Sequence, residues 1–217
     1  MKNTLQPLSE LISLKGKRAL ITGSAVGIGR AIAMRFAEAG ADLELVDINL
    51  EGLRRVRGEL SRFESEIGIH SADLSQKEAI DALWKQLEGR QPEILVNNAG
   101  IYPFKNFLEV DHAFLRRVMD INLSSAFWMC QHMIRARAKR GGVIINIGSI
   151  EAILPFAENL IPYNISKAGV IALTRALAKE YGKHGFRINV IVPGGIVTPG
   201  TRAVAREITQ LRIGLVK

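Results

Sequence analysis

Residues 18–29, with the sequence RALITGSAVGIG, decide the fold of this chain. The apolar run from Arg18 to Thr22 predicts a buried strand, the glycines that follow predict a turn, and apolar residues then recur at helical spacing as far as Ala39. Glycines let such a turn close tightly and approach a pyrophosphate, which the N–H groups and positive dipole end of the helix favour. The segment therefore predicts a dinucleotide-binding turn in a βαβ unit, with a plain tight turn as the alternative.

The alternation of strand and helix continues along the chain. Further apolar strands are expected at 42–46, 67–71, 94–96, 143–147 and 187–192, and helices at 28–39, 50–64, 76–88, 112–137, 163–181 and 200–211. Strands that are apolar along their whole length predict a parallel sheet covered on both faces. We therefore expect one α/β domain over 1–217, with an irregular arm at 1–16 and a Rossmann-like, doubly wound sheet in three α/β/α layers.

The composition is that of an ordinary globular domain, with 47% hydrophobic and 23% charged residues. No apolar run reaches the roughly 18 residues that a membrane-spanning helix needs. The start of the chain, Met1 to Lys17, lacks the compact apolar core and cleavage site of a secretory signal. The single cysteine, Cys130, lies in an apolar run and is expected to be a buried, unreactive thiol. These features predict a cytoplasmic protein with no membrane partner, disulfide or metal site.

The chain is strongly basic, with a net charge of +8 and a pI near 9.9, which favours an anionic partner. A phosphate-bearing cofactor and a nucleic acid both qualify. However, the chain has no zinc-ligand spacing, aromatic RNA-binding motif or basic zipper. Its densest basic stretch, 135–140, fits the last turn of a helix, where cations complement the dipole. We therefore expect a small-molecule ligand and no nucleic acid.

The end of the second expected strand carries Asp47, 18 residues after Gly29. A carboxylate there can accept hydrogen bonds from an adenosine ribose and would repel a 2′-phosphate. No arginine follows it, since the next residues are Ile48 and Asn49, and Val26 in the turn is not basic. The sequence therefore predicts NAD rather than NADP, with a helix N-cap as the alternative role for Asp47.

A tyrosine and a lysine, Tyr163 and Lys167, stand four residues apart in an expected helix. Residues at this spacing share one helical face, so the phenol and the ammonium can point into one site. An ammonium beside a phenol favours the phenolate, which lowers the phenol's pKa from about 10 toward the working range of an acid or base. Taken alone, the pair also fits an ordinary surface helix.

Taken together, the motifs of this chain resemble those of the short-chain dehydrogenase/reductase family over about Leu14 to Thr198. They stand in the family's order: TGSAVGIG (22–29), Asp73-Leu74, NNAG (97–100), Asn122, Ser149, YNISK (163–167) and PGGIVT (193–198). The resemblance implies hydride transfer between a nicotinamide cofactor and a secondary alcohol or ketone. It also implies a homo-oligomer, either a dimer or a tetramer.

The resemblance gives each catalytic residue a role. Tyr163 would be the general acid/base, and Lys167 would lower its pKa and hold the nicotinamide ribose. Ser149 would donate to the substrate oxygen, and Asn122 would anchor a water that links the lysine to solvent. The alternatives are a strand-end cap for Ser149 and a helix-break residue bonded to its own backbone for Asn122.

The resemblance also implies a set of cofactor contacts. We expect these residues to bind the cofactor: Gly23, Ser24, Gly27, Ile28, Gly29, Asp47, Asp73, Leu74, Asn97, Ala99, Tyr163, Lys167, Ile196 and Thr198. The last two would read the nicotinamide amide, the pair at 73–74 would face the adenine, and Asn97 and Ala99 would line the ribose side. Asn98, in contrast, is expected to brace strands.

Three features depart from the family pattern. Ser149 and Tyr163 are 14 residues apart, one more than expected, and the extra residue in the apolar loop between them should alter the pocket wall rather than the chemistry. Glu151 lies two residues past the serine, where a carboxylate would favour a hydroxylated or cationic substrate, although an exposed loop charge is the alternative. We also expect residues 199–217 to form only part of a substrate lid, and the family's last strand to be missing.

Three functions remain open from the sequence. The leading hypothesis is an NAD-dependent dehydrogenase or ketone reductase of a sugar, polyol or similar small substrate. A 3-oxoacyl thioester reductase is an alternative, which the basic surface would suit and Asp47 opposes, because such reductases normally use NADPH. A non-catalytic dinucleotide-binding sensor or scaffold is the alternative from another class, and the complete Asn-Ser-Tyr-Lys set argues against it.

Overall fold

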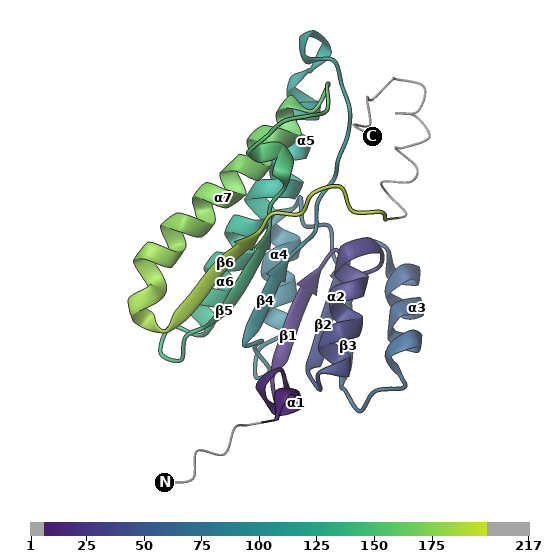
Figure 1. Cartoon of the computed structure of the whole chain (residues 1–217), viewed down its shortest axis with the longest axis vertical. Helices are drawn as coiled ribbons and strands as arrows, with labels where there is room; N and C mark the ends of the chain where they lie inside the picture. The colour runs from purple at the N-terminus through teal and green to yellow at the C-terminus, as the bar shows by residue number, and fades with distance from the viewer. Residues whose placement is uncertain (1–6, 199–217) are drawn as a thin grey trace.

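The computed structural model describes residues 7–198, in which a parallel sheet of six strands lies between layers of helices (Figure 1). The strands are β1 (Arg18–Thr22), β2 (Asp42–Asp47), β3 (Ile67–Ser71), β4 (Ile94–Asn97), β5 (Gly142–Ile147) and β6 (Phe186–Ile191). They lie in the order β3-β2-β1-β4-β5-β6 and all pair in parallel. This confirms the doubly wound, Rossmann-like sheet, and each strand end lies within one residue of its expected position.

The helices that connect the strands also follow the sequence pattern. They are α1 (Leu8–Leu11), α2 (Gly27–Glu38), α3 (Leu50–Leu60), α4 (Lys77–Gln86), α5 (His112–Met119), α6 (Ser125–Ala136) and α7 (Ile161–Tyr181). Helix α7 begins two residues before its expected start, and its second residue is Pro162, which suits a first helical turn because its missing N–H has no partner there. The arm expected to be irregular contains the short α1.

The helix expected at 112–137 is divided as the sequence predicted, near Asn122. Asp111 caps the start of α5 by accepting a 2.7 Å hydrogen bond from the Phe114 N–H. A π-helical turn, Asp120–Ser124, then separates α5 from α6. Such a turn inserts a residue into the helical repeat and turns a side chain to a new face. Here Asn122 is left only 2% exposed.

Alternate side chains of β1 enter two separate hydrophobic cores. Ala19 and Ile21 pack with buried residues of α2 and α3, such as Leu53. Leu20, which points to the opposite face, packs with buried residues of α4 and α6, such as Met129. All of these side chains are fully buried, so helices cover both faces of the sheet as the three-layer fold requires.

A charged residue, Glu44, is fully buried within the otherwise apolar middle of β2. Its carboxylate accepts a 2.8 Å hydrogen bond from Arg18 Nη1 and lies 2.7 Å from His70 Nε2. Burial alone raises the pKa of Glu44, but the hydrogen bonds from His70 and Arg18 outweigh it, and the pKa lies below its ordinary value. These partners compensate for the buried charge at the end of the sheet opposite the glycine turn.

The strand order reverses between β1 and β4, which places the candidate site. In such sheets, ligands bind outside the carboxyl ends of the strands at the point of reversal. The glycine turn leaves β1 there, and the NNAG segment leaves the neighbouring β4. The helix expected at 200–211, the partial lid and the missing strand concern residues outside the described range.

Candidate active site

The glycine-rich turn joins β1 to α2 and folds tightly on itself. Gly23 and Gly27 have φ angles of +63° and +58°, in the region that favours glycine. A Cβ atom at Gly29 would lie 2.2 Å from the carbonyl oxygen of Gly23. The turn therefore has no room for a larger side chain at this position, and its backbone is bare where a pyrophosphate would approach.

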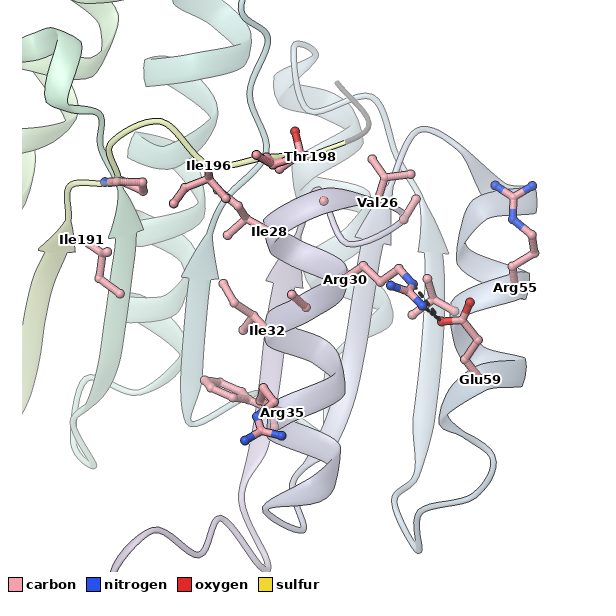
Figure 2. Close-up of a pocket in the computed structure, with 17 residues that line it drawn as sticks. Val26, Ile28, Arg30, Ile32, Arg35, Arg55, Glu59, Ile191, Ile196 and Thr198 are labelled. Atoms are coloured by element: carbon pink, nitrogen blue, oxygen red, sulfur yellow. Dashed lines mark hydrogen bonds and ion pairs between the residues drawn. The ribbon is translucent and has the colours of Figure 1, made fainter. Parts of the chain in front are cut away.

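No side chain caps the N-terminus of α2 within residues 7–198. The first N–H groups of α2 and the positive end of its dipole are therefore available to an anion. Thr198 packs against this end, because a Cβ at Gly27 would lie 3.6 Å from Thr198 Cβ and Cγ2. Figure 2 shows Thr198 and Ile196 beside Ile28 at the start of α2. The segment that ends at Thr198 thus forms a second wall over the turn.

Two polar side chains brace the turn against β2. Ser24 is fully buried, and both its hydroxyl and its main-chain N–H donate to the Val46 carbonyl at 3.2 Å, so Ser24 holds the turn against β2. Asp47 accepts a 3.0 Å hydrogen bond from the Ala25 N–H. The N-cap of α3 is Asn49, whose Oδ1 accepts from the Gly52 N–H at 2.9 Å. Asp47 is therefore not the N-cap considered from the sequence, and its half-buried carboxylate stands beside the turn.

The end of β4 is tied to the turn through Thr22. Its Oγ1 accepts hydrogen bonds from the N–H groups of Asn98 at 2.9 Å and Ala99 at 3.0 Å. The Asn98 amide donates to the carbonyls of Thr22 and Gly23, both at 3.0 Å. Asn98 thus braces the strands as expected, and the main chain of Ala99 is held beside the glycine turn.

The side chain of Asn97 points into the core, so a cofactor on the ribose side would meet only its main chain. Its Nδ2 donates to Asn146 Oδ1 at 2.8 Å and to Cys130 Sγ at 3.3 Å. Asn146 in turn donates to Thr174 in α7 at 2.9 Å. The alternation of β4 gives the reason, because Asn97 is in phase with Leu95, which belongs to the same core.

Burial also raises the pKa of the Cys130 thiol to about 12, which agrees with the unreactive thiol expected from the sequence.

The pair after β3 divides between solvent and core. Asp73 is exposed, and its Oδ1 accepts a 3.0 Å hydrogen bond from the Ser75 N–H. Leu74 is only 7% exposed and belongs to the core built by α4 and α6. A ligand at this edge would therefore meet the side chain of Asp73 but only the main chain of Leu74.

Three of the expected catalytic side chains meet where β5 ends. Ser149 follows β5, while Tyr163 and Lys167 lie one turn apart on α7. The Lys167 Nζ donates to the Ile147 carbonyl at 2.9 Å and lies 5.9 Å from the centre of the Tyr163 ring. Ser149 Oγ accepts from the Glu151 N–H at 3.2 Å and caps a short 3₁₀ helix at 150–152. Ser149 thus has a capping role, the alternative considered from the sequence. Its O–H group remains able to donate a hydrogen bond to a substrate.

Burial governs the pKa of both groups on α7. It raises the pKa of Tyr163, a hydrogen bond with Ser149 lowers it, and the negative charge of Glu151 raises it again, leaving the pKa above its ordinary value. Burial lowers the pKa of Lys167 to about 8. The sequence argument expected Lys167 to lower the tyrosine pKa. In the structure burial dominates instead, so Tyr163 is a protonated acid at neutral pH.

The fourth expected residue, Asn122, joins the end of β4 to α7. Its Oδ1 accepts from the Ile101 N–H at 2.8 Å, and its Nδ2 donates to the Ile101 carbonyl at 3.0 Å and to Ser166 Oγ at 3.1 Å. The alternative role required a hydrogen bond from Asn122 to the backbone of its own helix, and within residues 7–198 its side chain makes none. A Cβ at Gly100 would lie 3.2 Å from Asn122 Oδ1 and 3.4 Å from Lys167 Nζ. The Asn122 amide and the Lys167 ammonium therefore both lie beside Gly100.

Sequence reasoning missed one aromatic residue and left the burial of an acidic residue open. The Tyr102 ring meets the Tyr163 ring edge-on, with 4.6 Å between centres, and also contacts Phe104 at 5.0 Å. Burial, with the charges of Glu151 and Tyr163, raises the pKa of Tyr102 to about 12. Glu151 is 2% exposed, which excludes the exposed loop charge considered above. The signal for Tyr102 was its position two residues past NNAG, at the carboxyl end of β4.

A pocket of about 870 Å³ opens along the outer face of α2 (Figure 2). It begins at the glycine turn and is bounded by apolar side chains such as Ile32, Phe36 and Ile191. Arg30, which forms a 2.6 Å ion pair with Glu59, stands at its edge. Ser149, Tyr163 and Lys167 do not line this pocket, so it adjoins the expected cofactor turn and not the reacting groups.

Among residues 7–198, no helix combines the length and apolar character needed to cross a bilayer. Over the same range, no three His, Cys, Asp or Glu side chains are grouped so as to hold a metal ion.

The chain matches a family model described as short chain dehydrogenase over residues 17–209. It is 38% identical over 194 residues to galactitol 2-dehydrogenase (L-tagatose-forming) of Cereibacter sphaeroides, a match that covers 87% of this chain and 74% of that protein. It is 36% identical over 187 residues to D-xylose 1-dehydrogenase of Caulobacter vibrioides, covering 86% and 74%.

A solved structure has the same fold. L-sorbose reductase from Gluconobacter frateurii, complexed with NADPH and L-sorbose, superposes with a TM-score of 0.87 at 32% identity. The match covers 92% of this chain and 77% of that one.

Proposed function

The chain belongs to the short-chain dehydrogenase family, and on that premise we propose that it transfers hydride between a nicotinamide cofactor and a secondary alcohol or ketone of a sugar, polyol or similar small molecule. The observation that carries the proposal is the meeting of Ser149, Tyr163 and Lys167 close to an uncapped helix N-terminus whose turn is bare of side chains. When bound there, the cofactor supplies or accepts the hydride.

Tyr163 is the proposed acid and base. In the reducing direction its O–H gives a proton to the substrate oxygen, and its raised pKa keeps that proton in place at neutral pH. In the oxidising direction the phenolate takes the proton back. The O–H of Ser149, whose oxygen already accepts from the Glu151 N–H, donates to the same substrate oxygen and stabilises negative charge that develops on it.

Lys167 is proposed to hold the ribose and to exchange protons with Tyr163. Its pKa of about 8 lets it gain or lose a proton near neutral pH at little cost. Asn122 acts as a positioning residue, because its amide fixes both the Ile101 main chain and Ser166 on α7. A water held in this region would link the ammonium to solvent.

We propose that the cofactor is NAD. The support is Asp47, whose carboxylate binds the Ala25 N–H and stands beside the glycine turn. An adenosine 2′-hydroxyl can donate to such a carboxylate, whereas a 2′-phosphate would meet like charge. The L-sorbose reductase structure is a complex with NADPH. The proposed preference of this chain for NAD therefore rests on Asp47 alone.

We also propose that the chain pairs with a second copy. Large apolar side chains are exposed on α5, α6 and α7, namely Leu115, Phe127 and Ile165. Exposed apolar surface of this kind often marks a protein interface. Sedimentation velocity would give the mass, and a monomer at micromolar concentration would overturn this part of the proposal.

The function is tested by following the absorbance of reduced nicotinamide with NAD or NADP and a panel of polyols and secondary alcohols. Tyr163→Phe should lower kcat by about 10²–10⁴-fold, the usual contribution of a general acid or base. Cofactor affinity, measured by fluorescence titration, should stay close to that of the wild type. Activity that survives the substitution would exclude the mechanism. Tight cofactor binding without turnover of any substrate would favour the sensor.

A further inference from the structure

The carboxylate of Glu151 has one oxygen that the protein leaves unsatisfied. Its Oε2 accepts a 3.3 Å hydrogen bond from the Phe156 N–H. Its Oε1 is buried and has no hydrogen-bond partner among residues 7–198. Leaving such an acceptor unpaired is unfavourable, and more so when it is charged. A bound ligand with an O–H group would remove this cost.

Two observations place this oxygen at the reacting end of the site. The Glu151 N–H donates to Ser149 Oγ at 3.2 Å, so the residue is joined directly to the serine that faces the substrate oxygen. Its charge also acts on the hydroxyls of both Tyr163 and Tyr102, whose rings touch at 4.6 Å between centres. The carboxylate therefore lies near enough to both tyrosine hydroxyls for its charge to act on them.

Glu151 is covered by a loop whose own apolar side chains face solvent. The 3₁₀ helix at 150–152 is followed by Ile153, Leu154 and Phe156, whose side chains are each more than half exposed. The only hydrogen bond from this stretch to the carboxylate is the 3.3 Å contact with Phe156. A substrate that enters beside Ser149 would therefore reach the covered Oε1 by displacing this exposed stretch of the loop.

We propose that Glu151 selects the substrate by accepting, through Oε1, a hydrogen bond from a hydroxyl on the carbon next to the reacting carbon. The inference rests on the proposed hydride transfer and narrows its substrate to vicinal diols and hydroxyketones, as in polyols and open-chain sugars. A monohydroxy alcohol would leave the carboxylate unpaired. A 3-oxoacyl thioester would present only acceptor oxygens beside its reacting carbonyl, so the same carboxylate disfavours it.

Two substrates that differ by one hydroxyl test the proposal, butane-2,3-diol and butan-2-ol. The wild type should have the higher kcat/KM for the diol. In Glu151→Ala the ratio of the two kcat/KM values should fall roughly 10-fold or more, as for the loss of a hydrogen bond to a charged group. The isosteric Glu151→Gln should lower the ratio too. Glu158→Gln, at an exposed position of the same loop, should not change it.

An equilibrium measurement separates recognition from turnover. In the Tyr163→Phe background, calorimetric titration of the cofactor complex with erythritol reports binding alone, and adding Glu151→Ala should raise Kd roughly 10-fold. Thermal melts check the folding of each variant, and Glu151→Gln decides the question where the alanine variant does not fold.

The outcomes separate this inference from the function on which it rests. Turnover with an unchanged diol preference in both Glu151 variants would overturn the inference alone. A wild type that binds cofactor but turns over no alcohol or ketone would overturn the proposed function, and the erythritol titration would then decide the role of Glu151. A higher kcat/KM for 3-aminobutan-2-ol than for the diol would show that the carboxylate selects a cation instead.

Discussion

The ammonium of Lys167 is almost wholly buried and donates a 2.9 Å hydrogen bond to the main-chain carbonyl of Ile147, the last residue of β5. The bond fastens α7 to the sheet at the site where Tyr163 and Ser149 meet. It also holds a charge where burial disfavours it, so that the lysine pKa falls to about 8. One residue thus links the stability of the fold to the protonation of the site.

The buried lysine predicts a pH-dependent stability. Below pH 8 it is charged in both the folded and unfolded states, and burial of the charge opposes folding. Between about 8 and its ordinary value of 10.5 the unfolded chain binds more protons, so the free energy of unfolding rises with pH. The free energy of unfolding of the wild type, minus that of Lys167→Met, should therefore rise across this window by at most about 3 kcal/mol.

Urea denaturation at a series of pH values measures this difference. Groups that titrate alike in both proteins cancel, and the carbonyl left unpaired by the methionine adds a constant offset. Curves that run parallel from pH 8 to 10.5 would show that the lysine does not lose its proton there.

Replacing a glycine with alanine should have opposite effects on stability in the glycine turn and in helix α3. In Gly29→Ala the new methyl would lie 2.2 Å from the Gly23 carbonyl oxygen, which forces the turn apart. We expect a loss of about 1–3 kcal/mol of stability or more, together with weaker cofactor binding. Gly58→Ala is the matched control, because this glycine is exposed in α3 with nothing within 4 Å of its Cβ position.

The Gly58 variant should gain roughly 0.5–1 kcal/mol from helix propensity alone. Thermal melts and nucleotide titrations of both proteins compare the two sites. Equal stability changes at the two glycines would contradict the close approach within the turn.

Two variants of Asp47 test the proposed preference for NAD over NADP. The wild type should use NAD more efficiently than NADP, and Asp47→Asn should lower this preference roughly 10-fold or more, because the like charge that opposes a 2′-phosphate is removed. The asparagine oxygen can still accept from the Ala25 N–H, which holds the turn, while the hydrogen bond from the Asn49 N–H to the second carboxylate oxygen is lost. Asp47→Ala should relax the preference as well but weaken the binding of both nucleotides.

The measurement is kcat/KM for each nucleotide at a fixed substrate concentration. A wild type that already prefers NADP would show that this carboxylate does not set the choice.

The central strands β1, β2 and β4 could be predicted closely because each is a short, largely buried run bounded by a turn residue, whereas β3 and β6 carry half-buried or exposed residues. The helix break near Asn122 was also predictable, but its π-helical form was not, since a wider turn leaves no separate mark in the periodicity. That Tyr163 and Lys167 lie close together on α7 could be predicted from their i, i+4 spacing alone, whereas their acid/base role came from the family resemblance and is a proposal.

Side-chain direction was harder to predict than position. Asn97 could be found at the end of β4, yet its amide is used inside the core, and only the phase it shares with Leu95 indicates this. Glu151 lies in a loop, where no periodicity tells a buried side chain from an exposed one. Its burial depends on how residues 150–162 fold over the site, which is a tertiary property.

The charge of Glu151 predicts the pH profile of the reaction. It raises the pKa of Tyr163, in opposition to the hydrogen bond from Ser149. Neutralising it in Glu151→Gln should therefore lower the tyrosine pKa. Alcohol oxidation needs the phenolate, so its kcat/KM should begin to rise at a lower pH than in the wild type. Ketone reduction needs the phenol, so its kcat/KM should begin to fall at a lower pH as well.

Profiles of kcat/KM in both directions measure this effect, with butan-2-ol and butan-2-one as substrates that lack the neighbouring hydroxyl. Glu158→Gln removes an exposed charge from the same loop and should leave both profiles in place. The groups that act on the Tyr163 hydroxyl are Ser149 and Glu151, with the Lys167 ammonium on the same helix face. The lysine is unchanged in both variants, so a shift confined to Glu151→Gln comes from the carboxylate. A shift to higher pH would mean that Glu151 does not act on the tyrosine through its charge.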